Sequence, residues 1–82
     1  MAEVKVTLGE DGEAYVDLAG GARPEVRHSV ALDGLEQADD IPALGSVVLD
    51  FDHYGRLVGI EVWRSAESVL APALIEAAER SS

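Results

Sequence analysis

The sequence predicts an α+β fold, a five-strand antiparallel β meander with a C-terminal α-helix packed on one face. In five stretches between residues 3 and 63, apolar and polar residues alternate with the period of two that is typical of half-buried strands. Between residues 66 and 80 the apolar residues change to helical spacing. A chain of 82 residues that is 48% hydrophobic has room for one core, so we expect a single domain over residues 1–82.

The first two strands are expected between residues 3 and 18, where turn residues 9–12 separate two alternating stretches. The apolar positions of this hairpin are Val4, Val6, Leu8, Ala14, Val16 and Leu18. Glycine and proline over residues 20–24 then break the pattern. Alternation resumes from Glu25 and predicts a third strand.

Residues 33–45 are expected to form a loop, with one helical turn over residues 35–40 as a possibility. A loop of about 13 residues is long for a compact domain and is therefore either functional or locally packed. The apolar residues Leu35, Ile41 and Leu44 favour packing.

A second hairpin is the strongest local feature. Strands over residues 46–51 and 56–63 flank the sequence Asp52-His-Tyr-Gly55, which suits a type I turn followed by a left-handed residue and a bulge. The helix follows at about residues 66–80, where Pro72 is well placed as a first helical residue. Its apolar stripe consists of Leu70, Leu74, Ile75 and Ala78.

The charge and composition of the chain limit the classes of partner that it is expected to bind. The 16 acidic and 6 scattered basic residues give a net charge of −10, which disfavours nucleic acid and anionic membranes. Without cysteine, the chain has no disulfide or thiolate chemistry. The acidic start does not resemble a secretory leader, and no apolar run approaches about 18 residues, so we expect a cytoplasmic protein without a membrane span.

Three carboxylates of the second hairpin are the candidates for chemistry. Asp50, Asp52 and Glu61, with Gly55, nearly match a calcium-loop template, but Tyr54 is a poor cation ligand there and the flanks favour strands over helices. We expect the side chains of Asp50 and Asp52 to lie on the same face of the sheet, where Glu61 faces them across the strand pair. The three could hold a divalent ion or share a proton, but solvated outer-face residues are the favoured interpretation, so no metal, cofactor or catalytic residue is assigned.

Other polar side chains are weaker candidates. His28 is in register with apolar neighbours and is expected to be partly buried, whereas His53 lies at a turn tip. No serine stands in a nucleophile-elbow motif.

An apolar face of the second hairpin is a candidate interface. If the helix covers the side that carries Leu49 and Phe51, the opposite side needs another cover. The interface candidates are Val58, Ile60, Val62 and Trp63.

The stretch Val48 to Val62, with Asp50-Phe-Asp52 followed by Gly55-Arg-Leu-Val-Gly-Ile-Glu61, resembles the signature of the YuzE-like family of small bacterial proteins of unknown function. Residues 12–18, Gly-Glu-Ala-Tyr-Val-Asp-Leu, are similar to the first hairpin of that family. Leu8-Gly9 and the long loop over residues 33–45 depart from its pattern. The resemblance implies a small antiparallel sheet with a helix, and it supplies no activity and no catalytic residues.

Three functional hypotheses remain open. The favoured one is a non-enzymatic binding or structural module that acts as a homodimer. The second is an acidic, antitoxin-like partner of a basic protein, and the third is a weak divalent-metal site or enzyme at Asp50, Asp52 and Glu61.

Overall fold

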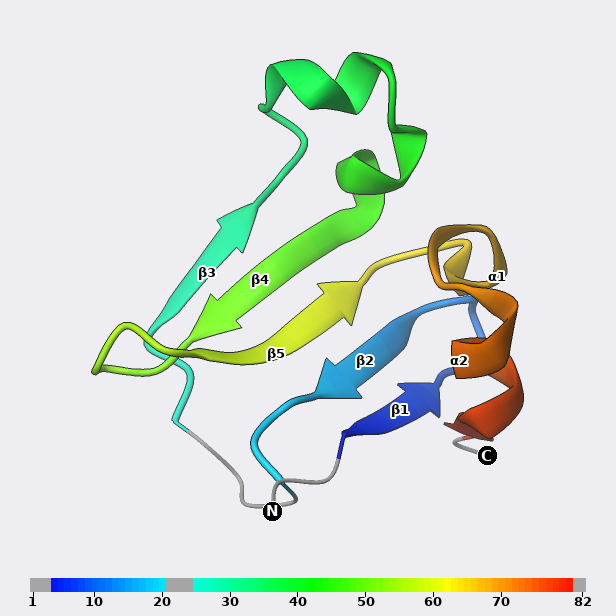
Figure 1. The fold of residues 1–82 in the computed structure, drawn as a ribbon, viewed down its shortest axis with the longest axis horizontal. Coiled ribbons are helices and arrows are strands. Elements are labelled where there is room, and N and C mark those ends of the chain that lie inside the picture. The colour runs from blue at the N-terminus through cyan, green and yellow to red at the C-terminus, as the bar shows by residue number, and fades with distance from the viewer. Residues whose placement is uncertain (1–3, 21–24, 81–82) are drawn as a thin grey trace.

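The computed structural model describes residues 4–20 and 25–80, which form one sheet with short helices at its ends (Figure 1). The strands are β1 (Lys5–Leu8), β2 (Ala14–Asp17), β3 (His28–Ala31), β4 (Val47–Phe51), β5 (Leu57–Val62) and β6 (Glu79–Arg80). Two 3-10 helices, η1 (Glu36–Asp39) and η2 (Pro42–Ser46), precede β4, and two α-helices, α1 (Ala66–Val69) and α2 (Pro72–Ala77), follow β5.

The predicted α+β class with five antiparallel strands is confirmed, but the strands do not follow one another as in a meander. Their order is β3-β4-β5-β2-β1-β6, so β2 pairs with β5 and the β4–β5 hairpin lies between the first hairpin and β3. About ten residues separate β2 from β3, which is too many for a tight hairpin turn. The longer connection lets the chain cross to the far edge, and the apolar strand β5 gains a central place with a partner on each side.

The C-terminal segment forms two short helices instead of the single predicted helix. The break lies at Leu70 and Ala71, whose ψ angles are 146° and 148°. Ala71 precedes Pro72, and the proline ring disfavours the helical conformation in the residue before it. The last two residues predicted as helix, Glu79 and Arg80, form β6 and pair in parallel with Thr7 and Leu8.

The core lies under these helices at one end of the sheet. Leu8, Ala14 and Val62 come from three neighbouring strands and are buried with Ala66 of α1. Partly buried apolar side chains of the C-terminal segment pack against this group, namely Val69, Leu70, Ile75 and Ala78. Figure 1 shows α1 and α2 at the β1–β2 side, well away from β3.

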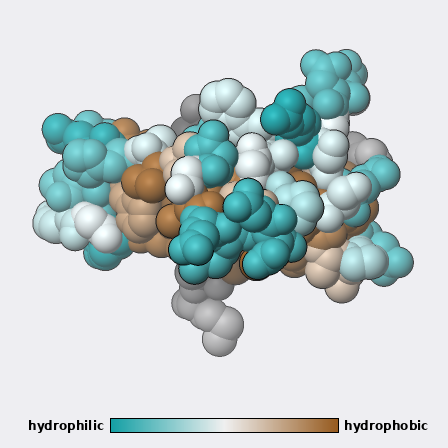
Figure 2. All heavy atoms as spheres, turned by 90° about the horizontal axis from the view of Figure 1, so that it is seen from above, coloured by the Kyte–Doolittle hydropathy of each residue, from teal (hydrophilic) through white to brown (hydrophobic). Residues whose placement is uncertain are grey.

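The predicted loop over residues 33–45 contains both 3-10 helices, which extend beyond the ends of β3 and β4 (Figure 1). Of the three residues that were expected to pack, Leu35 and Ile41 are 48% and 50% exposed, whereas Leu44 is half-buried. Figure 2, which looks onto this end of the molecule, shows hydrophobic residues exposed between hydrophilic ones. The loop is therefore structured but loosely packed.

The β4–β5 turn forms as predicted. Gly55 has a φ of 79°, and its N–H donates to the carbonyl of Asp52 at 3.0 Å. The Asp52 N–H donates in turn to the carbonyl of Arg56 at 2.9 Å, and the register shifts between Asp50 and Phe51 as in a β-bulge. Among the residues described, no helix has the length and apolar character needed to cross a membrane.

Candidate functional site

A polar network occupies the sheet face opposite the helices. Cross-strand partners share a face, and the register aligns Asp17, Gly59, Asp50 and Ser29 in one row across β2, β5, β4 and β3. Asp50 lies in the middle of this row and is only 2% exposed. The Ser29 hydroxyl donates a hydrogen bond of 2.7 Å to its carboxylate.

Gly59 makes room for the next member of the network, Tyr15. A Cβ atom at Gly59 would overlap the hydroxyl end of the Tyr15 ring, so the phenol lies directly over this glycine. Burial raises the pKa of Tyr15, and the nearby carboxylates of Asp50, Asp17 and Glu61 raise it further. Tyr15 is therefore held as a neutral phenol against the carboxylates.

Glu61 completes the network beside Asp50. Hydrogen bonding with Asp50 is the largest cause that raises the pKa of Glu61, followed by burial and by the negative charge of Asp50, while a hydrogen bond with Trp63 opposes the shift. A protonated Glu61 can donate to Asp50, whereas two ionised carboxylates repel each other. The pair is thus suited to hold one proton.

The network joins side chains from four adjacent strands. Tyr15, Ser29, Asp50 and Glu61 come from β2, β3, β4 and β5 respectively. Its most buried member, Asp50, is enclosed by its neighbours and is not open to a substrate in solution. The arrangement ties the strands together and can take up or release a proton.

The three predicted carboxylates do not form one cluster. Asp50 and Glu61 meet, but Asp52 lies beyond the end of β4 and does not share their row. Within the described residues, no three His, Cys, Asp or Glu side chains are placed to hold a metal ion. The flanks of the calcium-loop near match form the strands β4 and β5, as predicted, and Glu61 lies in the returning strand.

Asp52 instead organises the turn. Its Oδ1 accepts hydrogen bonds from the backbone N–H groups of Tyr54 at 2.9 Å and Arg56 at 3.0 Å, and Arg56 Nε donates to Oδ2 at 2.9 Å. The hydrogen bond from the Arg56 backbone is the largest cause that lowers the pKa of Asp52. Because β4 ends at Phe51, Asp52 belongs to the turn, and its carboxylate is used by the turn instead of by the row that contains Asp50.

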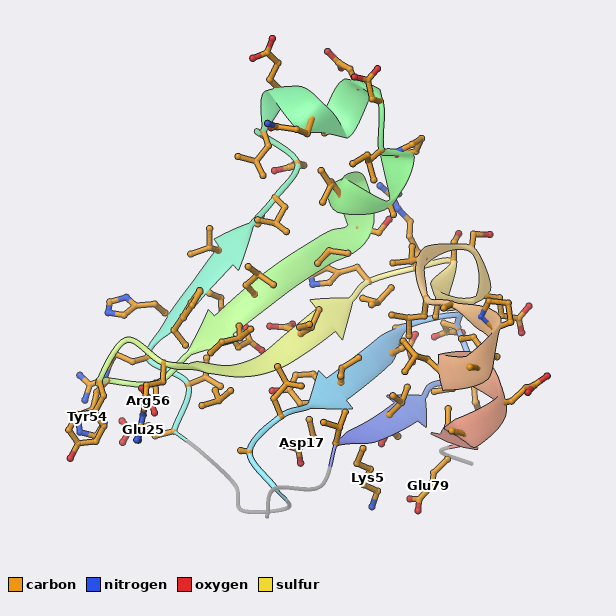
Figure 3. All side chains as sticks on the ribbon, viewed as in Figure 1. Lys5, Asp17, Glu25, Tyr54, Arg56 and Glu79 are labelled. Carbon is orange, nitrogen blue, oxygen red and sulfur yellow. The ribbon has the colours of Figure 1, made fainter. Side chains whose placement is uncertain are left out.

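The hairpin tip presents an ordered aromatic and cationic group (Figure 3). Tyr54 is 70% exposed, the Arg56 guanidinium carbon lies 4.7 Å from the centre of its ring, and the His53 ring centre lies 3.9 Å away. His53 is thus at the tip, as predicted. His28 is exposed, contrary to the expected partial burial, because its strand is the edge of the sheet.

The structure places the four interface candidates in different environments. Val47 pairs with Val62 and Leu49 pairs with Ile60, so these residues share the helix face instead of lying on opposite faces. Val58 and Val62 are 7% and 1% exposed, and burial within the chain removes both from any interface. Trp63 is 67% exposed and lines a hollow on the opposite face with Ala31 and Val48.

Two members of the network, Tyr15 and Ser29, were not predicted as site residues from the sequence, and neither was Gly59, which makes room for the Tyr15 ring. Tyr15, Ser29 and Gly59 lie far apart along the chain, and only the strand order and register bring them to Asp50. A correct pairing of β2 with β5 would have found Tyr15 opposite Glu61.

Comparison with protein-family models, curated proteins and solved structures finds no match to this chain. The resemblance to the YuzE-like family therefore stays a prediction.

Proposed function

We propose that the chain is a non-enzymatic binding or structural module that works as a homodimer. The observation that carries this proposal is the uncovered half of the sheet. The helices pack over the ends of β1, β2 and β5, while all four residues of β3 are exposed. Val30, which is 48% exposed, extends the apolar row of Val16, Ile60 and Leu49 to the open edge.

Charge placement supports a second copy of the same chain, despite its net charge of −10. The register places Val30, Val47 and Leu49 on the helix face, and it places Asp50 and Glu61 on the other. The helix face of β3 and β4 thus carries no carboxylate between residues 28–31 and 47–51. Two such surfaces can approach without opposing acids.

The buried network supports a structural role for its carboxylates. The Asp50 carboxylate accepts a hydrogen bond from Ser29 and interacts with Tyr15 and Glu61, so it links the strands of the sheet that presents the open half. A catalytic carboxylate has to reach its substrate, which Asp50 does not in this arrangement.

Sedimentation equilibrium over a wide concentration range tests the proposal. We expect a reversible transition toward twice the chain mass of 8.7 kDa. A strict monomer at the highest concentrations would overturn it.

A further inference from the structure

The two edges of the sheet end in strands of different length, because the edge strand β6 has two residues and the edge strand β3 has four. At one edge, β6 pairs with β1, and the exposed Lys5 and Glu79 form an ion pair of 3.0 Å (Figure 3). At the other edge, β3 pairs with β4 on its inner side only, and no described element lies beyond it (Figure 1). An open edge strand presents unpaired backbone groups that another strand can bind.

The hydrogen bonds of β3 show which groups are open. The Leu32 N–H donates to the Val47 carbonyl at 3.2 Å, and these two residues are directly opposite when the β3–β4 register is continued by one residue. In an antiparallel pair, alternate residues bond to the partner strand and the residues between them point away. The N–H and C=O groups of Ser29 and Ala31 therefore point out of the sheet.

The ends of β3 differ in charge. Near its start lie Arg27, with its partner Glu25, and the hairpin tip with Arg56, where each guanidinium is balanced by one carboxylate. Beyond its end, the segment of residues 33–40 carries four exposed acids and no cation, namely Asp33, Glu36, Asp39 and Asp40. Along this edge, the charge is therefore balanced near the start of β3, where the two arginines lie, and strongly negative beyond its end.

We propose that β3 pairs in antiparallel fashion with β3 of a second copy around a two-fold axis at Val30, so that the two sheets become one. This proposal rests on the proposed homodimer and names its interface. Pairing Ser29 with the partner's Ala31, and the reverse, uses all the outward backbone groups of both residues. The two Val30 side chains meet at the axis, where residues of a non-hydrogen-bonded pair have Cα atoms about 4.5 Å apart.

The charges favour this orientation and this occupant. Antiparallel pairing brings the arginine end of each β3 beside the acidic end of the other, so that Arg27, just before β3, lies near the partner's Asp33, just after it. A parallel arrangement would bring the two acidic segments together. Because both contacts occur twice under two-fold symmetry, a second copy is complementary at both ends of the strand.

The joined sheets also place the uncovered helix faces side by side. The apolar rows that end at Val30 in each copy become continuous across the axis. The same sheet therefore offers one extended apolar surface in the dimer.

Edge variants with a matched control test the pairing by sedimentation equilibrium. Val30→Lys places two ammonium groups at the axis, and we expect the dimer dissociation constant to rise by about tenfold or more. Val4→Lys changes a valine that is 57% exposed and precedes β1, near the opposite edge of the sheet, and it should leave dimerisation unchanged. Ala31→Pro removes an outward N–H without removing a β3–β4 hydrogen bond, so it should weaken the dimer as well.

A charge exchange tests the orientation. Arg27→Glu should weaken the dimer, and adding Asp33→Arg to it should restore most of the affinity, which a purely structural effect at either position would not do. Amide exchange of the unmodified protein gives a readout that does not depend on the folding of any variant. The Ser29 and Ala31 amides should become protected as concentration rises.

The outcomes separate the two proposals. A monomeric wild-type chain overturns the homodimer and the pairing together. A dimer whose Ser29 and Ala31 amides stay unprotected, or that tolerates both Val30→Lys and Ala31→Pro in folded form, overturns the pairing alone.

Discussion

The covered and the open half of this sheet carry the same alternating pattern of apolar residues but differ in burial. In β1 and β2, the side chains on the helix face, Val6, Leu8, Ala14 and Val16, are 4% to 6% exposed. In β3, the corresponding Val30 is 48% exposed. The alternation determines which face of a strand is apolar, whereas burial needs a second layer above that face.

The length of the C-terminal segment explains which half is covered. After β5 the chain turns at Ser65, whose φ is 55°, and then forms helices of only four and six residues before it pairs with β1. These helices are too short to extend over the whole sheet, and their apolar residues are used against Leu8, Ala14 and Val62. The half at β3 and β4 is not covered by these helices.

The largest expected contrast between the halves is in core truncation. Leu8→Ala removes a side chain that is 4% exposed, and we expect it to lower the free energy of unfolding by about 2–5 kcal/mol. Val30→Ala, measured by urea unfolding at concentrations that keep the chain monomeric, should cost no more than about 0.5 kcal/mol. Similar losses at the two positions would show that the open half is packed after all.

A second contrast concerns the polar face, where Tyr15 lies over Gly59. Gly59→Ala forces the phenol to move, and overpacking of this kind typically costs about 1–3 kcal/mol. In a Tyr15→Ala background the same substitution should cost less, because the overlapping ring is gone. Equal costs in both backgrounds, measured by urea unfolding as a double-mutant cycle, would contradict the assigned contact.

A smaller effect is expected from the proton held by Glu61. Because folding raises its pKa, its stabilising contribution is full below the ordinary glutamate pKa and is lost as pH rises through the raised value. Glu61→Gln keeps a donor toward Asp50 without the charge. We expect it to stabilise the protein at neutral pH by on the order of 1 kcal/mol and to flatten stability in the mildly acidic range. Thermal unfolding across pH checks this, and a variant that is less stable at neutral pH would refute it.

The smallest effect is expected at the edge of the sheet where β6 pairs with β1. Lys5 and Glu79 form an exposed ion pair, and exposed pairs contribute about 0–1 kcal/mol. Lys5→Ala should therefore change the free energy of unfolding by a few tenths of a kcal/mol. It should leave the dissociation constant of the proposed dimer unaltered. A large loss of stability would mean that the pairing of β6 with β1 stabilises the sheet more than is expected of a strand of two residues.

Local features of the fold were readable from the sequence. The period-two pattern predicted five strands, and the residues from Asp52 to Gly55 predicted a turn that the structure confirms. These features depend on contacts between residues close in the chain, where backbone preferences act directly. The predicted break over residues 20–24 falls largely outside the described residues.

Strand order, by contrast, was decided by tertiary structure. A meander joins strands in order of sequence, but β2 pairs with β5. Within the β4–β5 hairpin, the register shift between Asp50 and Phe51 places Ile60 and Val62 on the helix face, opposite Leu49 and Val47. The β2–β5 pairing also brought Tyr15 to Glu61 and Asp50, so the burial of Asp50, the most buried polar side chain among the described residues, could not be identified from spacing alone.

The sequence by itself therefore determined the class of fold, the strands and the β4–β5 turn. Only the tertiary structure decided the strand order, the Asp50 network and the open edge at β3. The physical reason is that the pairing of distant strands depends on the closure of long connections and on which apolar faces match. Period-two alternation does not decide between pairings, because it is the same for every register that keeps the apolar faces together.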